Sequence, residues 1–132
     1  MTDPRFIPNY TIAEVARYID IPKARLREAA AGKRYLSFTD LTDLYRSTRT
    51  IHSTTLIMID DEDQPAMLFL RGGPVTLDPH ISFGLPHING IRTDAIASRF
   101  RAGDTIAGLA TDYDLAPDLI EEAIRFELSI AR

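Results

Sequence analysis

The stretch Thr11–Arg34, TIAEVARYIDIPKARLREAAAGKR, contains two helical segments that are separated by only a few residues. Apolar side chains recur at helical spacing between Ile12 and Ile19, which predicts the first helix. Pro22 suits the first position of a second helix, expected over about residues 22–31, and Gly32 is expected to end it. Two short helices joined by a tight turn predict a helix-turn-helix.

Capping signals mark where two of the helices should begin. Thr11 and Glu14 have the spacing of a capping box, in which each side chain accepts a hydrogen bond from the other residue's backbone N–H. A third helix is predicted over SFTDLTDLYRS, residues 37–47, where Ser37 and Asp40 have the same spacing. The N-terminal part of the chain is therefore expected to be helical.

The second helix and the loop after it concentrate positive charge. The basic residues are Lys23, Arg25, Arg27, Lys33 and Arg34, and only Glu28 opposes them. Because Lys23 and Arg27 are four residues apart, they share one face of the helix, and we expect this to be the outer face if Leu26 points inward. We expect this face to enter the major groove of DNA, with flanking cations on the phosphates. A merely solvated helix face is the alternative interpretation.

Strand-like runs follow the helices. TTLIMID (54–60) and PAMLFL (65–70) are rich in β-forming residues and flank DEDQ (61–64), which predicts a hairpin. The sequence GGPVTLD (72–78) predicts a short third strand. The acidic run Asp60–Asp63 is expected to be a solvated hairpin tip, because adjacent like charges repel and favour water.

The segment HISFGLPHINGIR, residues 80–92, combines turn-forming residues with two histidines. Gly84 and Pro86 are expected to shape one turn, and Asn89–Gly90 can supply the positive φ of a tight hairpin turn. Three apolar side chains are expected to anchor the segment on the helices: Ile81, Phe83 and Ile88.

Catalysis by this chain is not expected. A site made of His52, His80 and His87 is conceivable for a metal-dependent enzyme, but their spacing does not support it. There is no cysteine, and no Ser or Thr stands in a recognisable catalytic motif. We therefore expect a binding protein with no metal and no cofactor.

Three more helices are predicted, over residues 93–102, 104–113 and 117–130. Asp104 is the expected cap of the second of these, and Pro117 suits the first position of the third. The predicted fold is mainly α with a small β connector. It comprises a helix-turn-helix head (1–53), a β-hairpin connector (54–79) and a three-helix, helix-turn-helix-like domain (80–132).

The last predicted helix has two apolar faces. One consists of Ile120, Ala123, Ile124 and Leu128, and the other of Leu119, Phe126 and Ile130. A small domain can bury one face internally, so the second face predicts a partner surface. Packing of the second face on the β connector is the alternative.

Charge is divided unevenly along the chain. The net charge is −4, yet residues 1–53 carry nine Lys/Arg against six Asp/Glu, whereas residues 54–132 carry six against thirteen. A cationic head and an anionic tail suggest different partners for the two ends. No membrane-spanning run or signal peptide is evident, so we expect a cytoplasmic protein.

The head resembles that of MerR-like regulators. The resemblance rests on TI-x-EVA (11–16), Ile21, Leu26–Arg27 and LSFTDL (36–41). It implies that the second helix reads the major groove while a short wing contacts the backbone. This chain lacks the long dimerisation helix of full-length members, yet one head covers only a few base pairs, so we expect a homodimer that forms elsewhere.

Residues from Val75 to Glu127 are similar to a small domain of unknown function found in VapB-type antitoxins. The shared motifs include DP (78–79), I-x-FG-x-P (81–86), RF-x-AG (99–103), A-x-x-Y (110–113) and EA-x-RFE (122–127), with Gly90 and Arg92. Longer members have a helical insert between head and tail, which residues 47–73 replace here.

The resemblance implies a type II antitoxin that represses its own operon and binds a PIN-like ribonuclease toxin, as a dimer or a larger assembly. The toxin-binding residues would be Leu119, Glu122, Arg125, Phe126, Ile130 and Arg132. A stand-alone dimeric regulator, without a toxin, is the alternative.

Overall fold

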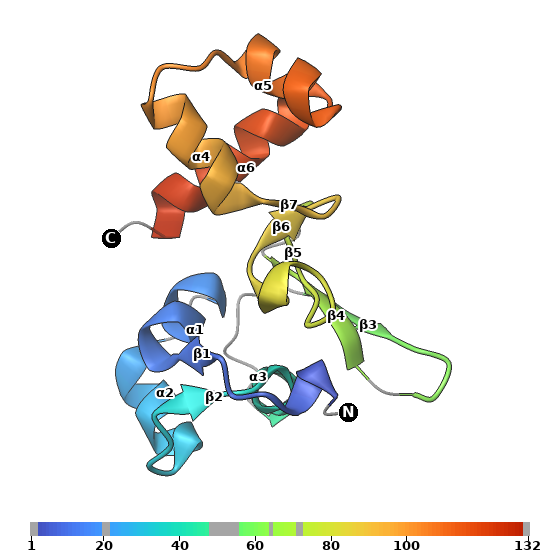
Figure 1. Cartoon of the computed structure of the whole chain (residues 1–132). Coiled ribbons are helices and arrows are strands. Elements are labelled where there is room, and N and C mark those ends of the chain that lie inside the picture. Colours follow the sequence, from blue (N-terminus) through green and yellow to red (C-terminus); the bar gives the residue numbers. More distant parts are fainter. Residues whose placement is uncertain (1–2, 20–21, 48–55, 64, 71–72, 131–132) are drawn as a thin grey trace. The chain divides into compact units, whose positions relative to one another are not determined.

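The computed structural model describes residues 3–19, 22–47, 56–63, 65–70 and 73–130. The chain divides into two compact units, Met1–Gly72 (unit 1) and Gly73–Arg132 (unit 2). Helices predominate in both units and the strands are short (Figure 1), which confirms the predicted mainly α class with small β elements. None of the described helices is long and apolar enough to cross a membrane.

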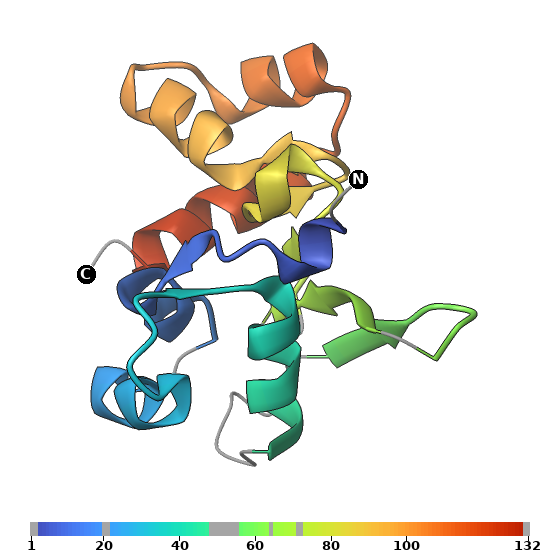
Figure 2. The ribbon, with the colours of Figure 1, turned by 60° about the horizontal axis from the view of Figure 1, so that its bottom comes forward.

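In its described residues, unit 1 contains three helices, a short two-stranded sheet and a hairpin. In chain order its elements are η1 (Pro4–Phe6, a 3-10 turn), β1 (Tyr10–Thr11), α1 (Ile12–Ile19), α2 (Lys23–Ala30), β2 (Tyr35–Leu36), α3 (Phe38–Ser47), β3 (Leu56–Ile59) and β4 (Pro65–Phe69). Strands β1 and β2 pair antiparallel, with Tyr10 opposite Leu36. Figure 2 shows α3 (teal) between α2 (light blue) and the β3–β4 hairpin (green).

Both predicted capping boxes are confirmed. The backbone N–H of Thr11 donates to Glu14 Oε1 at 3.0 Å, and the N–H of Glu14 donates to Thr11 Oγ1 at 3.1 Å. The N–H of Ser37 donates to Asp40 Oδ2 at 2.9 Å, and that of Asp40 donates to Ser37 Oγ at 3.1 Å. These bonds satisfy backbone donors that a helix start leaves without an intrahelical acceptor, and so fix where α1 and α3 begin.

Helix α2 is shorter than predicted at both ends. Pro22 keeps an extended ψ of 137° and is the N-cap, since its carbonyl accepts the first helical bonds from Arg25 and Leu26. At the other end Ala31 already adopts the left-handed conformation (φ 52°), one residue before Gly32 (φ 87°). The helix therefore ends at Ala30, and the turn after it uses two left-handed residues.

The core of unit 1 comes from the inner faces of its helices. Five apolar side chains of these helices are at most 1% exposed: Val15, Ile19, Leu26, Phe38 and Leu41; Tyr10, Leu68 and Leu70, outside the helices, are equally buried. Full burial of each such side chain stabilises the fold by roughly 1.5–3 kcal/mol. This core holds α1 and α2 together, and so positions the outer face of α2.

The predicted β3–β4 hairpin is confirmed. The strands pair antiparallel, with Leu56 opposite Phe69. At the tip, the N–H of Glu62 donates to Asp60 Oδ1 at 2.9 Å, and residues 61–63 are exposed to solvent. Asp60 also accepts from Arg5 Nη1 at 3.3 Å, which ties the start of the hairpin turn to the N-terminal segment.

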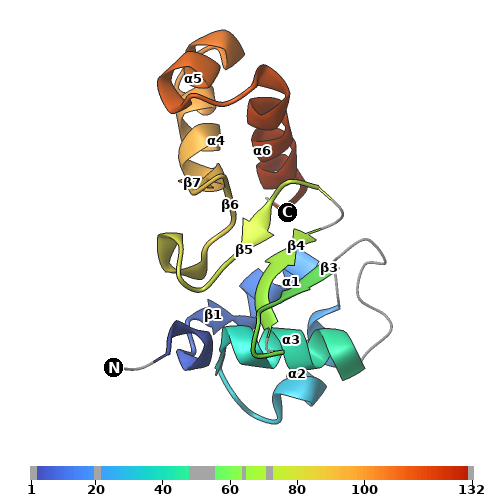
Figure 3. The same cartoon turned by 90° about the vertical axis from the view of Figure 1, so that its right-hand side faces the viewer.

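Unit 2 contains a small antiparallel sheet followed by three helices. Its elements are β5 (Thr76–Leu77), η3 (Ser82–Gly84, a 3-10 turn), β6 (His87–Ile88), β7 (Ile91–Arg92), α4 (Thr93–Arg101), α5 (Ile106–Tyr113) and α6 (Pro117–Ile130). Helices α4 and α5 both pack on α6, as Figure 3 shows. Helix α6 begins at Pro117, as predicted.

The predicted cap of α5 is wrong by one residue. Thr105, with extended backbone, is the N-cap, and its Oγ1 accepts from the N–H of Gly108 at 3.0 Å. Asp104 Oδ2 instead accepts from Arg99 Nε at 2.7 Å. Both Asp and Thr favour N-cap positions. The carboxylate of Asp104 forms an ion pair with Arg99 of α4, so Thr105 caps α5 instead.

The two-residue turn between β6 and β7 is confirmed. Asn89 (φ 50°) and Gly90 (φ 84°) are both left-handed, and they join strands in which Ile88 lies opposite Ile91. Positive φ at both central residues is the requirement of the tight hairpin turn that Asn-Gly favours. Ile88 is 1% exposed and anchors the segment, as expected.

The other two predicted anchors of this segment are wrong. Ile81 is 37% exposed and Phe83 is 83% exposed. Ser82 (φ 52°) and Phe83 (φ 57°) are both left-handed, although neither is glycine. The turn that they form leaves the Phe83 ring in solvent instead of against the helices.

Candidate functional site

The basic residues predicted on α2 lie on its outer face. Leu26 (0% exposed) and Ala30 (5%) form the buried side of this helix. Lys23, Arg25 and Arg27 are exposed to solvent. The amphipathic pattern of α2 therefore directs three cations away from the core of unit 1.

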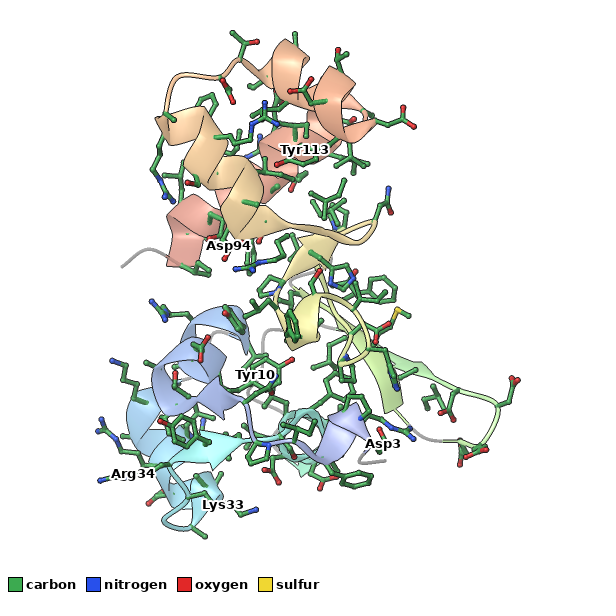
Figure 4. The ribbon with its side chains drawn as sticks, in the orientation of Figure 1. Asp3, Tyr10, Lys33, Arg34, Asp94 and Tyr113 are labelled. Atoms are coloured by element: carbon green, nitrogen blue, oxygen red, sulfur yellow. The ribbon has the colours of Figure 1, made fainter. Side chains whose placement is uncertain are left out.

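Three of the five predicted DNA-binding residues surround one open hollow. Arg27, Lys33 and Arg34 line it, with the start of α1 and Gly32, and its volume is about 550 Å³. In Figure 4 Lys33 and Arg34 extend from the loop between α2 and β2. The left-handed turn at the end of α2 brings this loop to the hollow, whereas Lys23 and Arg25 do not line it.

Lys33 and Tyr35 complete this surface. Lys33 Nζ lies 3.4 Å from Asp40 Oδ1, and the Lys33 side chain is 59% exposed, so the ion pair restrains it weakly. Tyr35 is 54% exposed and follows Arg34 directly. Tyr35 was not among the residues predicted from the sequence, although an aromatic residue directly after a basic cluster is a signal for it. Its hydroxyl can donate to a phosphate oxygen.

This surface suits a polyanion. Its cations project from a helix and an adjoining loop, so they can meet charges spaced along an extended backbone. Glu28 is the exposed acidic residue of α2. We name the exposed set Lys23, Arg25, Arg27, Lys33, Arg34 and Tyr35 the basic face.

The predicted partner surface on α6 needs correction. Phe126 is only 7% exposed, so it belongs to the interior of the chain. Leu119, Glu122 and Ile130 are half-buried, and Arg125 is exposed and forms an ion pair with Glu122. Arg132 lies outside the described residues. The apolar side chains of α6 that were predicted to form a partner surface are therefore at least partly buried within the chain.

Leu128 was predicted to face the interior and is instead 62% exposed. Its expected neighbours Ile120, Ala123 and Ile124 are buried, as predicted. Thr93, the first residue of α4, donates through Oγ1 to Glu127 Oε2 at 2.8 Å. Because α4 begins at this point, the last turn of α6 extends past it and leaves Leu128 uncovered.

Arg99 connects α4 with the following loop and with α5. Its Nε donates to Asp104 at 2.7 Å, its Nη2 donates to Asp112 at 2.6 Å, and its guanidinium carbon lies 5.3 Å from the centre of the Tyr113 ring. The bond to Asp112, together with those to Asp104 and Tyr113, raises the pKa of Arg99 above its ordinary value. The motif residues Arg99 and Tyr113 thus serve to position α5.

The two histidines of unit 2 lie in different environments. His80 is exposed, and its Nδ1 lies 3.5 Å from Asp78 Oδ1. His87 is 3% exposed, and its Nδ1 lies 3.2 Å from the carbonyl oxygen of Leu85. His52 lies outside the described residues, and the described part of the chain contains no group of three His, Asp or Glu that could hold a metal ion.

Comparison with known proteins finds a family model that matches part of unit 2 and a solved structure with a similar fold. Residues 75–126 match the family described as protein of unknown function DUF433. The chain is also similar to the crystal structure of Rv2018 from Mycobacterium tuberculosis, with 19% identity, a TM-score of 0.76, and coverage of 91% of this chain and 99% of that one. No curated protein matches. The likeness to Rv2018 concerns the fold alone.

Proposed function

We propose that this protein is the antitoxin of a type II toxin–antitoxin pair, in which unit 1 binds operator DNA and unit 2 binds the toxin. The observation that carries the proposal is the exposed basic face of unit 1 in a chain whose other unit is acidic. Support for the toxin comes from the similarity of residues 75–127 to the domain found in VapB-type antitoxins. The two roles use different units, so they can be tested separately.

The DNA-binding role follows from charge and shape. Helix α2 and the loop after it present five cations with a single opposing acidic residue, and three of the cations border one hollow. Each cation that neutralises a phosphate releases a condensed counterion, which makes binding strongly salt-dependent. With about four to six phosphate contacts per dimer, the log–log dependence of affinity on salt has a slope of roughly −4 to −5.

The toxin-binding role follows from the negative charge of unit 2. Residues 73–130 contain four arginines and nine Asp/Glu, a net charge of −5. A PIN-like ribonuclease handles RNA through basic groups and binds metal through carboxylates. An acidic domain can cover the basic groups, and the exposed Arg125 can approach the carboxylates. Neutralisation is then occlusion of the nuclease, without chemistry by this chain.

Co-expression with the product of the adjacent reading frame tests the proposal. We expect that product to arrest growth by itself, to be harmless beside this chain, and to co-purify with it. If the neighbouring product is harmless alone and does not co-purify, while this chain binds its own promoter, the protein is a stand-alone regulator. If neither partner is bound, the proposal is wrong in both parts.

Charge reversal on α2 is our first prediction. The double variant Lys23→Glu/Arg27→Glu places two negative charges against phosphates and should abolish binding to promoter DNA, while binding to the toxin stays unchanged. Arg101→Glu/Arg125→Glu changes the net charge equally in unit 2 and is the control for DNA binding. Mobility shifts on promoter DNA at several salt concentrations give the measurement. Full DNA binding by the α2 variant would show that another surface contacts the operator.

A further inference from the structure

The turn Ser82–Gly84 has an unusual backbone. Ser82 and Phe83 both adopt positive φ (52° and 57°), followed by Gly84 at 79°. For a residue with a side chain the left-handed conformation is unfavourable, because Cβ approaches the following carbonyl oxygen. Asn and Asp tolerate it better than Ser or Phe. Such conformations persist where the surrounding structure enforces them, and they concentrate at binding sites.

Hydrogen bonds enforce this conformation from both sides of the turn. The Ser82 hydroxyl donates to the carbonyl oxygen of Gly90 at 3.3 Å, which connects the turn with the β6–β7 hairpin. Three backbone N–H groups donate within the segment, each at 3.0 Å: Ile81 to Asp78, Gly84 to Ile81, and Leu85 to Ser82. The turn is therefore a defined structure, and the position of Phe83 is set by it.

The side chain of Phe83 and that of its neighbour Ile81 are exposed to solvent. Phe83 is 83% exposed, and Ile81 is 37% exposed. Other large apolar side chains in the described chain are less exposed, including Phe6 at 61% and Phe100 at 40%. A strained and well-held turn that places an aromatic ring in water fits a ring that is buried by another molecule.

We propose that Phe83 is the aromatic anchor through which unit 2 binds a basic protein, namely the nuclease of the proposed function, on which this inference rests. Aromatic side chains dominate the binding energy of many protein interfaces when they enter a pocket of the partner. Because the turn holds Phe83 in place beforehand, less conformational freedom is lost on binding. Ile81 widens the apolar contact.

The negative charge of unit 2 favours a basic protein over the other molecules that could bury Phe83. An exposed aromatic ring can also stack on a base of single-stranded nucleic acid, but such sites lie in cationic grooves. Unit 2 carries a net charge of −5 over its described residues, which repels a phosphate backbone. A second copy of unit 2 would bring the same negative charge to the contact. A basic protein is the occupant that this charge attracts.

Two substitutions of Phe83 test the inference with the full chain. Phe83→Asn and Phe83→Gly remove the ring and suit a left-handed backbone, so the melting temperature should stay the same or rise. Affinity for the purified product of the adjacent reading frame should fall at least tenfold. Phe100→Asn and Phe6→Asn, at other exposed phenylalanines, should change that affinity less than twofold.

The possible outcomes separate the inference from the proposed function. If the wild-type chain does not bind the neighbouring product, the proposed function fails and the inference fails with it. If the wild type binds and both Phe83 variants bind equally well, only the inference is overturned. Loss of oligomers in the Phe83 variants, or loss of binding to oligo-dT, would assign Phe83 to a second copy or to nucleic acid and would also overturn it.

Discussion

Single residues decide where the helices of this protein begin and end. Thr105 caps α5 through its hydroxyl, while the adjacent Asp104 bonds to Arg99. Ala31 and Asp114, both left-handed, end α2 and α5 respectively. The position of each of these helix ends is determined locally, because it depends on which backbone groups a nearby side chain or turn can reach.

Thr105→Ala should lower the free energy of unfolding by about 1 kcal/mol, because it removes the acceptor for the Gly108 N–H. Asp104→Ala should have a smaller effect, since it removes an ion pair between exposed groups. Guanidinium unfolding followed by circular dichroism at 222 nm measures both. A larger loss for the Asp104 variant would mean that the carboxylate is the true cap.

At the scale of elements, Arg99 organises the helical part of unit 2. One guanidinium on α4 bonds to a carboxylate in the following loop and to another on α5, and it lies over the Tyr113 ring of α5. A planar guanidinium can serve several acceptors and an aromatic face at once, which an ammonium group cannot. The orientation of α5 relative to α4 therefore depends on this side chain in addition to the apolar core.

Arg99→Ala and Arg99→Lys should both lower the melting temperature, and Lys should recover only part of the loss because its single ammonium cannot replace the whole set of contacts. Arg101→Ala, on the exposed face of the same helix, is the control and should leave the melting temperature unchanged. The difference between wild type and Arg99→Ala should shrink in 1 M salt, which screens exposed charges. Equal melting temperatures for all four proteins would contradict this role of Arg99.

At the scale of the whole molecule, each of the two units has its own fully buried apolar side chains, and the two units differ in their surface charge. Val15, Leu26 and Leu41 are fully buried in unit 1, and the same holds for Ile96 and Ile120 in unit 2. The basic face belongs to unit 1, whereas unit 2 is acidic and presents Phe83. Units of this size are only marginally stable when they are separated.

Fragments 1–72 and 73–132, produced separately, should divide the two activities. Fragment 1–72 should bind promoter DNA more weakly than the whole chain, and fragment 73–132 should be helical and should bind the neighbouring gene product. Gel shifts and calorimetry on the fragments, with the intact chain as control, provide the measurement. DNA binding confined to fragment 73–132 would contradict the assignment of α2.

Most local structure could be predicted because its causes lie within a few residues. The capping boxes at Thr11 and Ser37, the start of α6 at Pro117 and the Asn89–Gly90 turn all follow from contacts between near neighbours in sequence. The same applies to the exposure of the basic residues on α2, since Leu26 fixes the inner side of that helix. The sequence by itself thus determined the helices, the hairpins and the five cations of the basic face.

Only the tertiary structure decided which apolar side chains are covered. Phe126 is buried, Leu128 is exposed, and Phe83 stands in solvent, all against expectation. The convergence of Arg27 and Arg34 on one hollow also depends on the turn after α2. The physical reason is that burial depends on the elements packed around a residue, and those come from distant parts of the chain. Periodicity shows which residues share a helix face, whereas packing determines how much of that face another element covers.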